Sequence, residues 1–153
     1  MKDLRSIISL LGDLKFVDTE QVAYYGYSYG AAVGGILAAV EPRLKALVLA
    51  SGTGGRNSLR QSDPMFDIDP IHYVLHIGNV PILLQNGEDD RVIPKGAALL
   101  YQNTVSSDSK KVVWYPTGHF LSCDATKEAL SWLSEYIEVE VDSDYQCSRL
   151  PIL

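Results

Sequence analysis

The sequence predicts an α/β fold, with an open parallel sheet of about four strands and flanking helices. Short apolar runs, typical of strands buried on both faces of a sheet, alternate with segments of helical spacing. Three of these runs are followed directly by residues that can carry chemistry. The chain has 153 residues, of which 46% are hydrophobic, a composition normal for one packed domain.

The predicted elements follow one another in a regular order. Strands are expected at 22–26, 46–50, 80–85 and 112–115. Helices are expected at about 3–15, over the small-residue run 31–39, from Pro94 onward, and after Asp124, which can cap the last helix. The third helix carries Ala97, Leu100 and Tyr101, and the apolar face of the last one is expected at Ala129, Leu130, Leu133, Tyr136 and Ile137.

The first strand runs into the pentapeptide Gly26-Tyr27-Ser28-Tyr29-Gly30, which a helix follows. A serine on such a tight turn is forced into a strained backbone conformation that exposes its hydroxyl. The chain passes closely beside it, so we expect little room for a Cβ at Gly26 and Gly30. The three fixed positions alone would match by accident in about one chain in twenty of this length. The strand before and the helix after make the match specific.

A serine hydroxyl becomes a good nucleophile only when a base takes its proton and an acid orients that base. His119 lies just after the apolar run 112–115, and Asp90 lies just after the run 80–85. Loops that follow parallel strands meet at the carboxyl edge of the sheet, where ligands bind. The sequence therefore predicts that Ser28, Asp90 and His119 lie together.

These motifs resemble the carboxyl-terminal half of an α/β-hydrolase. The similarity is to the branch that holds dienelactone-hydrolase-like esterases and prolyl-oligopeptidase-like peptidases. It covers residues 2 to 137 and rests on the pentapeptide at 26–30, on Gly87-Glu88-Asp89-Asp90-Arg91-Val92-Ile93-Pro94, and on Gly118-His119-Phe120. In dienelactone hydrolases themselves a cysteine stands at the centre of this turn between strand and helix, which is called the elbow. Ser28 therefore favours the serine esterases.

The resemblance implies a role for each site residue. Ser28 would be the nucleophile, His119 the general base and then acid, Asp90 the orienting carboxylate, and Tyr29 one backbone oxyanion donor. Asp89 is the rival for the acid role, but the family spacing from the glycine selects Asp90. The expected function is hydrolysis of a small-molecule carboxylic ester. A prolyl-oligopeptidase-like peptidase and a catalytically inert fragment are the alternatives.

The full fold of this family has eight strands, and its nucleophile follows the fifth. Only about four strands are expected here, and the loop that supplies the family's second oxyanion donor has no counterpart. We therefore expect a fragment, a truncated product or a subunit. Its exposed sheet edge would pair with an amino-terminal half or with a second copy of the chain.

Composition and charge exclude several other classes. The net charge of −6 and the pI of about 4.9 argue against nucleic-acid binding. We expect no membrane span, no cofactor and no metal site, and a cytoplasmic location by default, because no signal peptide is evident. The domain is expected over 1–137, with an acidic, loosely ordered tail at 138–153.

The two cysteines and a pair of histidines are not expected to have a function. Cys123 and Cys147 are expected to be free thiols, because two cysteines are too few for a disulfide framework. His72 and His76 are spaced to share one helical face, but no third metal ligand is evident nearby.

Overall fold

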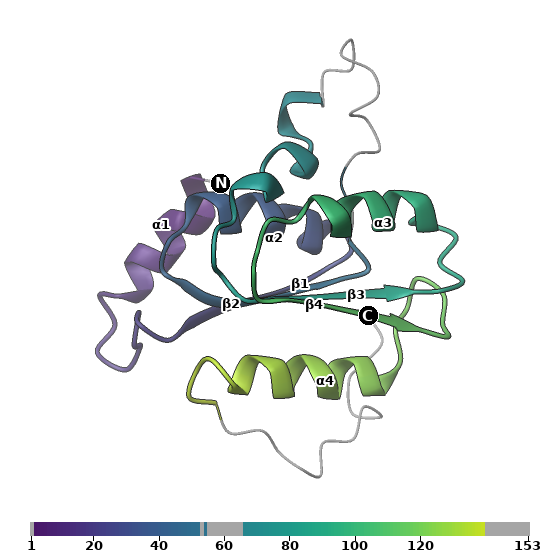
Figure 1. Cartoon of the computed structure of the whole chain (residues 1–153). Coiled ribbons are helices and arrows are strands. Elements are labelled where there is room, and N and C mark those ends of the chain that lie inside the picture. Colours follow the sequence, from purple (N-terminus) through teal and green to yellow (C-terminus); the bar gives the residue numbers. More distant parts are fainter. Residues whose placement is uncertain (1, 53, 55–65, 140–153) are drawn as a thin grey trace.

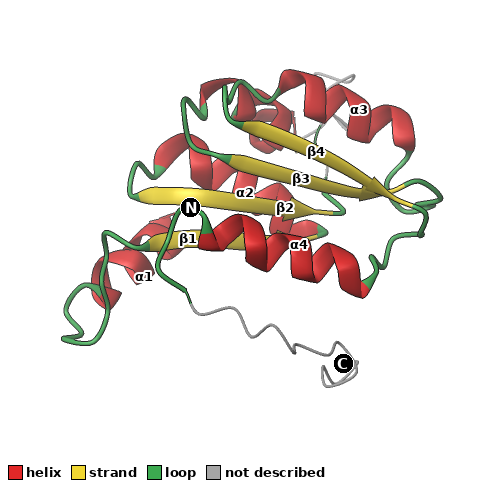
Figure 2. Cartoon of the chain, turned by 60° about the horizontal axis from the view of Figure 1, so that its bottom comes forward, coloured by secondary structure: helices red, strands yellow, loops and turns green. Residues whose placement is uncertain are grey.

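The computed structural model describes residues 2–52, 54 and 66–139 (Figure 1). Its centre is a parallel sheet in the order β1-β2-β3-β4. The strands are β1 (Val22–Tyr27), β2 (Leu44–Ala50), β3 (Ile82–Gly87) and β4 (Lys110–Tyr115). Because all four run in the same direction, their carboxyl ends lie at one edge of the sheet (Figure 2). The predicted fold class is confirmed.

Helices cover both faces of the sheet (Figures 1 and 2). One face carries α1 (Lys2–Leu11), α2 (Tyr29–Val40) and α3 (Lys95–Thr104), and the other carries α4 (Cys123–Ser134). Three short 3-10 helices, η1 (Phe66–Ile68), η2 (Pro70–His72) and η3 (Val74–His76), lie between β2 and β3 in the chain. Such helix-covered parallel strands are buried on both sides, which explains their continuous apolar runs.

The core is divided by the sheet into two parts. Side chains of successive strand residues point to opposite faces, so Leu47 and Leu49 pack with α2 and α3, whereas Val48 packs with α4. The larger part also takes in Leu37, Ile71, Val74, Ile82, Leu84 and Tyr101. On the opposite face, Leu83, Ala129 and Trp132 complete the smaller part.

Several boundaries and faces differ from the prediction. The first helix ends at Leu11 instead of near residue 15, and turns follow it. The last helix begins after Ser122, which takes the N-cap position predicted for Asp124. Its buried residues are Ala125, Ala129 and Trp132. Of the predicted face, Ala129 is buried and Leu133 and Tyr136 pack against the core, although Tyr136 and Ile137 lie beyond the end of the helix. In α3, Ala98, Tyr101 and Gln102 are buried and Leu100 is 47% exposed. Helical spacing alone leaves the rotation of a helix uncertain by about one residue, and packing against the sheet decides it.

The two histidines considered as metal ligands end two separate 3-10 helices. His72 is the last residue of η2 and His76 the last of η3, so the shared helical face that their spacing allows is not formed. Within residues 2–52, 54 and 66–139, no group of three His, Cys, Asp or Glu side chains could hold a metal ion.

Cys123 is part of a disulfide, so the prediction of a free thiol is wrong for this residue. The prediction weighed only the number of cysteines and the compartment, and neither says which side chains the fold brings together. Cys147 and most of the predicted tail lie outside the described residues.

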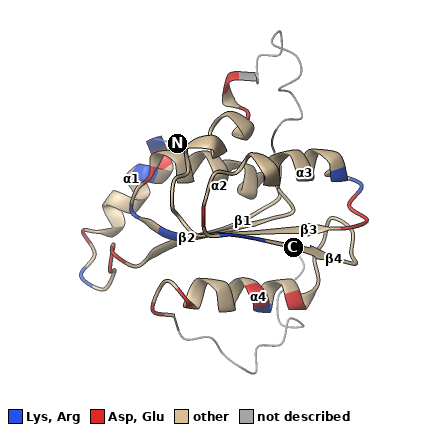
Figure 3. Cartoon of the chain, viewed as in Figure 1, with Lys and Arg blue, Asp and Glu red and all other residues tan. Residues whose placement is uncertain are grey.

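Charged residues are spread over the ends of the elements (Figure 3). They lie on α1, α4, the loops and the first residues of β2 and α3, whereas α2 carries none. Lys110 and Lys111 stand together at the start of β4. No helix among the described residues is both long and apolar enough to cross a lipid bilayer.

Candidate active site

Ser28 lies on a sharp turn between β1 and α2. Its backbone has φ 52° and ψ −113°, a left-handed conformation that is strained for any residue other than glycine. Ser28 is the N-cap residue of α2, yet its hydroxyl makes no cap hydrogen bond. Its backbone N–H donates to Ala50 O at 2.8 Å, which fixes the turn to the end of β2. The strained elbow predicted from the pentapeptide is therefore present, and its hydroxyl is available to other partners.

The two elbow glycines are not equivalent. A Cβ at Gly26 would lie 2.5 Å from Gly30 O and 2.6 Å from the ring of Tyr24, distances that real Cβ atoms do not show. A Cβ at Gly30 would meet only Tyr24 Oη, at 3.9 Å. The predicted crowding is thus correct for Gly26 and wrong for Gly30. Residue 30 contributes to the elbow through its backbone, which passes close to Gly26, and not through the absence of a side chain.

His119 and Asp90 reach Ser28 from the loops that follow β4 and β3. His119 Nε2 lies 2.9 Å from Ser28 Oγ, and His119 Nδ1 lies 2.8 Å from Asp90 Oδ2. The side chain of Asp90 is 2% exposed and that of His119 is 13% exposed. The fold therefore brings all three residues predicted from the sequence into one hydrogen-bonded line.

Asp90 is held by its own loop. The backbone N–H groups of Val92 and Ile93 donate to Asp90 Oδ1 at 2.7 and 2.9 Å. Burial alone would raise the pKa of this carboxyl, but these bonds and the His119 ring outweigh it and keep the pKa below its usual value. The rival carboxylate Asp89 is exposed. Asp90 is therefore the carboxylate that stays ionised beside the histidine.

The charge state of Asp90 fixes the roles of the ring nitrogens. An ionised carboxylate only accepts hydrogen bonds, so His119 Nδ1–H donates to it. In the neutral imidazole Nε2 is then the acceptor, and the Ser28 hydroxyl donates to it. This arrangement can take the serine proton at the moment when Oγ attacks an electrophile.

Three residues that sequence reasoning missed shape the His119 loop. Gly87 ends β3 where a Cβ would overlap the backbone oxygens of Thr117 and Gly118. Tyr27, the last residue of β1, and Ser51, which directly follows β2, both donate a hydroxyl hydrogen bond to His119 O. The position of Gly87 at a strand end was a usable signal, whereas nothing in the sequence indicates the two hydroxyl contacts.

Two aromatic rings border the site on the solvent side. Tyr29 follows the serine and is 77% exposed, and Phe120 follows the histidine and is 81% exposed. The Phe120 ring stacks on Tyr27, with 6.5 Å between the centroids, and meets the His119 ring edge-on at 5.9 Å. The site is thus open to solvent and has apolar surface beside the serine.

Comparison with known proteins gives a family match. The model of a family described as serine hydrolase (FSH1) matches residues 18–128, which is more than half of the chain. No curated protein sequence gives a significant match.

Many solved structures share the fold. Acetyl xylan esterase 1 from Thermoanaerobacterium sp. JW/SL YS485 is 20% identical with a TM-score of 0.72, and the match covers 87% of this chain and 51% of that one. A putative dienelactone hydrolase from Klebsiella pneumoniae subsp. pneumoniae MGH 78578 is 22% identical with a TM-score of 0.70, and the match covers 88% of this chain and 60% of that one. An acetyl xylan esterase from Paenibacillus sp. R4 is 17% identical with a TM-score of 0.73, and the match covers 88% of this chain and 51% of that one. The chain spans about half the length of these proteins.

Proposed function

This chain belongs to the serine hydrolase (FSH1) family, and from that premise we propose that it cleaves a carboxylic ester through an acyl-enzyme on Ser28. The observation that carries the proposal is the line of hydrogen bonds from Ser28 Oγ through the His119 ring to Asp90. A strained serine beside a buried histidine–carboxylate pair has the parts that activate a hydroxyl for acyl transfer.

In the proposed reaction, Ser28 Oγ attacks the ester carbonyl while its proton passes to His119 Nε2. Asp90 remains ionised and stabilises the imidazolium that forms. The same Nε2 then gives the proton to the leaving alkoxide, which departs as the alcohol. Water then gives a proton to His119 Nε2 as it attacks the acyl carbonyl. The bond from that carbon to Ser28 Oγ breaks, Oγ takes the proton back from Nε2, and the carboxylic acid is released.

The oxyanion of the tetrahedral intermediate would lie at the start of α2. The first N–H groups of a helix have no partner within the helix, and the helix dipole favours negative charge there. We assign the backbone N–H of Tyr29 as one donor. A second donor would come from a segment beyond these four strands, and its absence would lower the rate about a hundredfold to a thousandfold.

The proposed substrate class is a small ester, acted on in an open site. Two of the similar structures are acetyl xylan esterases, which favours short acyl groups. The exposed rings of Tyr29 and Phe120 offer apolar surface to the acyl or alcohol part.

We also propose that β1 accepts a further strand, from an amino-terminal half of the sheet or from a second copy. It lies at an edge of the sheet and carries no charged residue. The other edge strand, β4, begins with two lysines, which oppose strand addition. The match covers only 51% of each of two similar structures, which is consistent with further strands beside β1.

A fluorophosphonate probe tests the assembled site. The wild-type chain should be labelled on Ser28, Ser28→Ala should not be labelled, and His119→Ala should lose at least about a hundredfold in labelling rate. Asp90→Asn should also lose about a hundredfold or more, because the ring would hold the wrong tautomer.

The matched control is Asp89→Asn, which changes the neighbouring exposed carboxylate and should label like the wild type. Equal labelling of the Asp89→Asn and Asp90→Asn variants would contradict the proposal. Turnover of p-nitrophenyl acetate against proline-containing peptides then separates an esterase from a peptidase, and an unlabelled wild type would indicate an inert chain.

A further inference from the structure

We propose that Tyr27 and Ser51 are positioning residues for the general base, acting through the main chain of His119. Tyr27 Oη donates to His119 O at 2.5 Å, and Ser51 Oγ donates to the same oxygen at 2.8 Å. The inference rests on the proposed role of His119. It adds two residues that do not touch the reacting atoms but determine where the imidazole stands.

The base needs such support because of where it is located. His119 lies in residues 116–122, which connect β4 to α4 and belong to no helix or strand. To reach Ser28 at the end of β1, this loop must extend across β3 and β2. The bond from Nδ1 to Asp90 orients the ring, but it does not fix the backbone that carries the ring.

The hydroxyls of Tyr27 and Ser51 lie at the ends of β1 and β2. The His119 loop extends across β2 and reaches β1. Tyr27 is the last residue of β1 and directly precedes the nucleophile, and Ser51 directly follows the last residue of β2. Both strands are joined by an uninterrupted ladder near these ends. The two bonds therefore tie the carbonyl of the base to the same rigid edge that carries Ser28, which keeps the distance from Nε2 to Oγ constant.

Ser51 has a backbone conformation that its residue type does not favour. Its φ is 49°, in the left-handed region, and its side chain is fully buried. A glycine would adopt this conformation without the steric cost that a Cβ adds, but it would have no hydroxyl. Ser51 N also donates to Gln85 O at 2.7 Å, and this backbone hydrogen bond stabilises the strained conformation. A strained serine with its hydroxyl aimed at the catalytic loop is consistent with use of that hydroxyl.

Tyr27 contributes through its ring as well as its hydroxyl. The ring meets the His119 imidazole edge-on, with 5.7 Å between centroids. Burial raises the pKa of the phenol, so the hydroxyl keeps its proton and remains a donor. Tyr27→Phe retains the ring contact and removes the hydroxyl, which also interacts with the Ser51 side chain and the Leu121 backbone.

The experiment compares Tyr27→Phe, Ser51→Ala and the double variant with the wild type in ester turnover. Each single variant should lose about tenfold in kcat with little change in KM, because one donor still holds the carbonyl. The double variant should lose more than the product of the two, at least about three hundredfold, since no hydroxyl then remains. The rate of fluorophosphonate labelling should fall in parallel.

Two further variants separate positioning from stability. Ser107→Ala removes a hydroxyl that donates to Val80 O at 2.7 Å, a bond of the same kind far from the site in the fold. It should lower stability as Ser51→Ala does while kcat stays within about twofold. Ser51→Gly relieves the strain and also lacks the hydroxyl, so it should lose as much kcat as Ser51→Ala even if it is the more stable protein.

A proton NMR measurement keeps the outcome independent of turnover. The Nδ1 proton of His119 should give a slowly exchanging low-field signal in the wild type, and the signal should broaden or vanish in the double variant. If the wild type neither labels nor hydrolyses esters, the proposed function fails and this signal alone decides the positioning role. A double variant with unchanged kcat, or with an unchanged signal, would overturn the inference.

Discussion

At the residue scale, the elbow depends on one glycine more than on the other. The backbone of residue 30 passes so close to Gly26 that no side chain fits there, whereas Gly30 has open space where its Cβ would stand. Gly30 also lies in the first turn of α2, where alanine is the better helix former. The same pentapeptide therefore holds a required glycine and a replaceable one.

Gly26→Ala should destabilise the protein by at least about 2 kcal/mol, because the new methyl group must displace backbone rather than a flexible side chain. Gly30→Ala should change stability by less than about 0.5 kcal/mol or raise it slightly. Urea unfolding of the two variants measures both values. If Gly26→Ala loses as little stability as Gly30→Ala, the turn has moved to relieve the crowding at residue 26, and the prediction fails.

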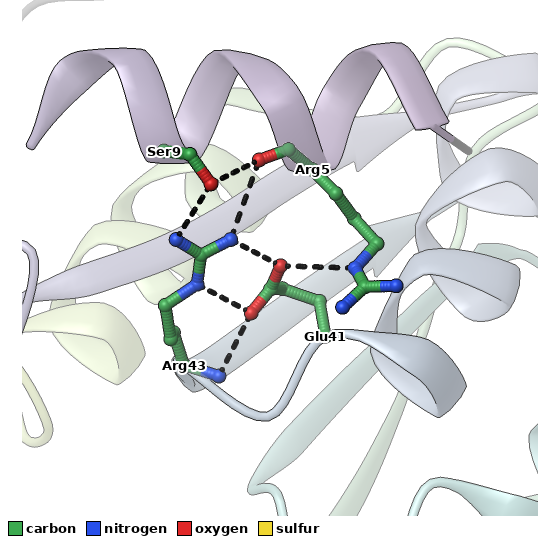
Figure 4. A network of polar contacts seen from close by, with 4 residues as sticks. All are labelled: Arg5, Ser9, Glu41 and Arg43. Carbon is green, nitrogen blue, oxygen red and sulfur yellow. Dashed lines mark hydrogen bonds and ion pairs between the residues drawn. The ribbon is translucent and has the colours of Figure 1, made fainter.

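At the element scale, a buried carboxylate joins α1 to the turn between α2 and β2 (Figure 4). Glu41 is 1% exposed and accepts hydrogen bonds from Arg43 Nε at 2.7 Å and from Arg43 Nη2 at 2.6 Å. Arg5 on α1 adds a longer contact from Nε at 3.4 Å, and Arg43 also donates to Ser9 Oγ and to Arg5 O. Because the partners surround both carboxylate oxygens, this network fixes how α1 lies on the sheet.

Glu41→Gln should lower the free energy of unfolding by about 2 to 3 kcal/mol at neutral pH. Hydrogen bonds from Arg43 lower the pKa of Glu41 from 4.5 to about 2, against the opposing effect of burial. A lowered pKa stabilises the fold above the unfolded value of 4.5, and this contribution is lost as the pH falls from 4.5 toward 2.

Urea unfolding at several pH values between 2 and 7 measures this effect. The wild type should lose stability across the acid window, and the variant should show a flatter dependence there. Glu20→Gln is the control: Glu20 is 81% exposed and pairs with Lys45 at 3.5 Å, so its loss should cost less than about 0.5 kcal/mol. Parallel pH curves for the wild type and Glu41→Gln would contradict this account.

At the scale of the whole molecule, the sheet has two edges of different character. The β1 edge is uncharged, and Tyr25 on it is 47% exposed. The β4 edge begins with Lys110 and Lys111. Unprotected edge strands pair with other chains, whereas lysines prevent such pairing. The proposed pairing with a second copy therefore places the contact at β1.

Tyr25→Lys should weaken self-association of the chain by about tenfold or more, because it places a charge on the edge that pairs. Val112→Lys places the same charge at a 38% exposed position of β4 and should leave association unchanged. Sedimentation velocity over a range of concentrations compares the two. Equal weakening by both substitutions, or none by Tyr25→Lys, would argue against pairing through β1.

The order and type of the main elements, and three residues of the candidate site, are readable from the sequence. Apolar runs reveal strands that are buried on both faces, and each of Ser28, Asp90 and His119 follows such a run directly. These are local signals, so they are readable without knowing how the chain folds. The strained elbow was predictable for the same reason, since five consecutive residues specify it.

Features that depend on contacts between distant segments become visible only in the folded chain. The bonds from Tyr27 and Ser51 to His119 O join residues 92 and 68 positions apart, and no local pattern encodes them. The same holds for the difference between Gly26 and Gly30 and for the disulfide at Cys123. Periodicity records which residues are apolar, but which side chains meet depends on how helices and loops pack across the sheet.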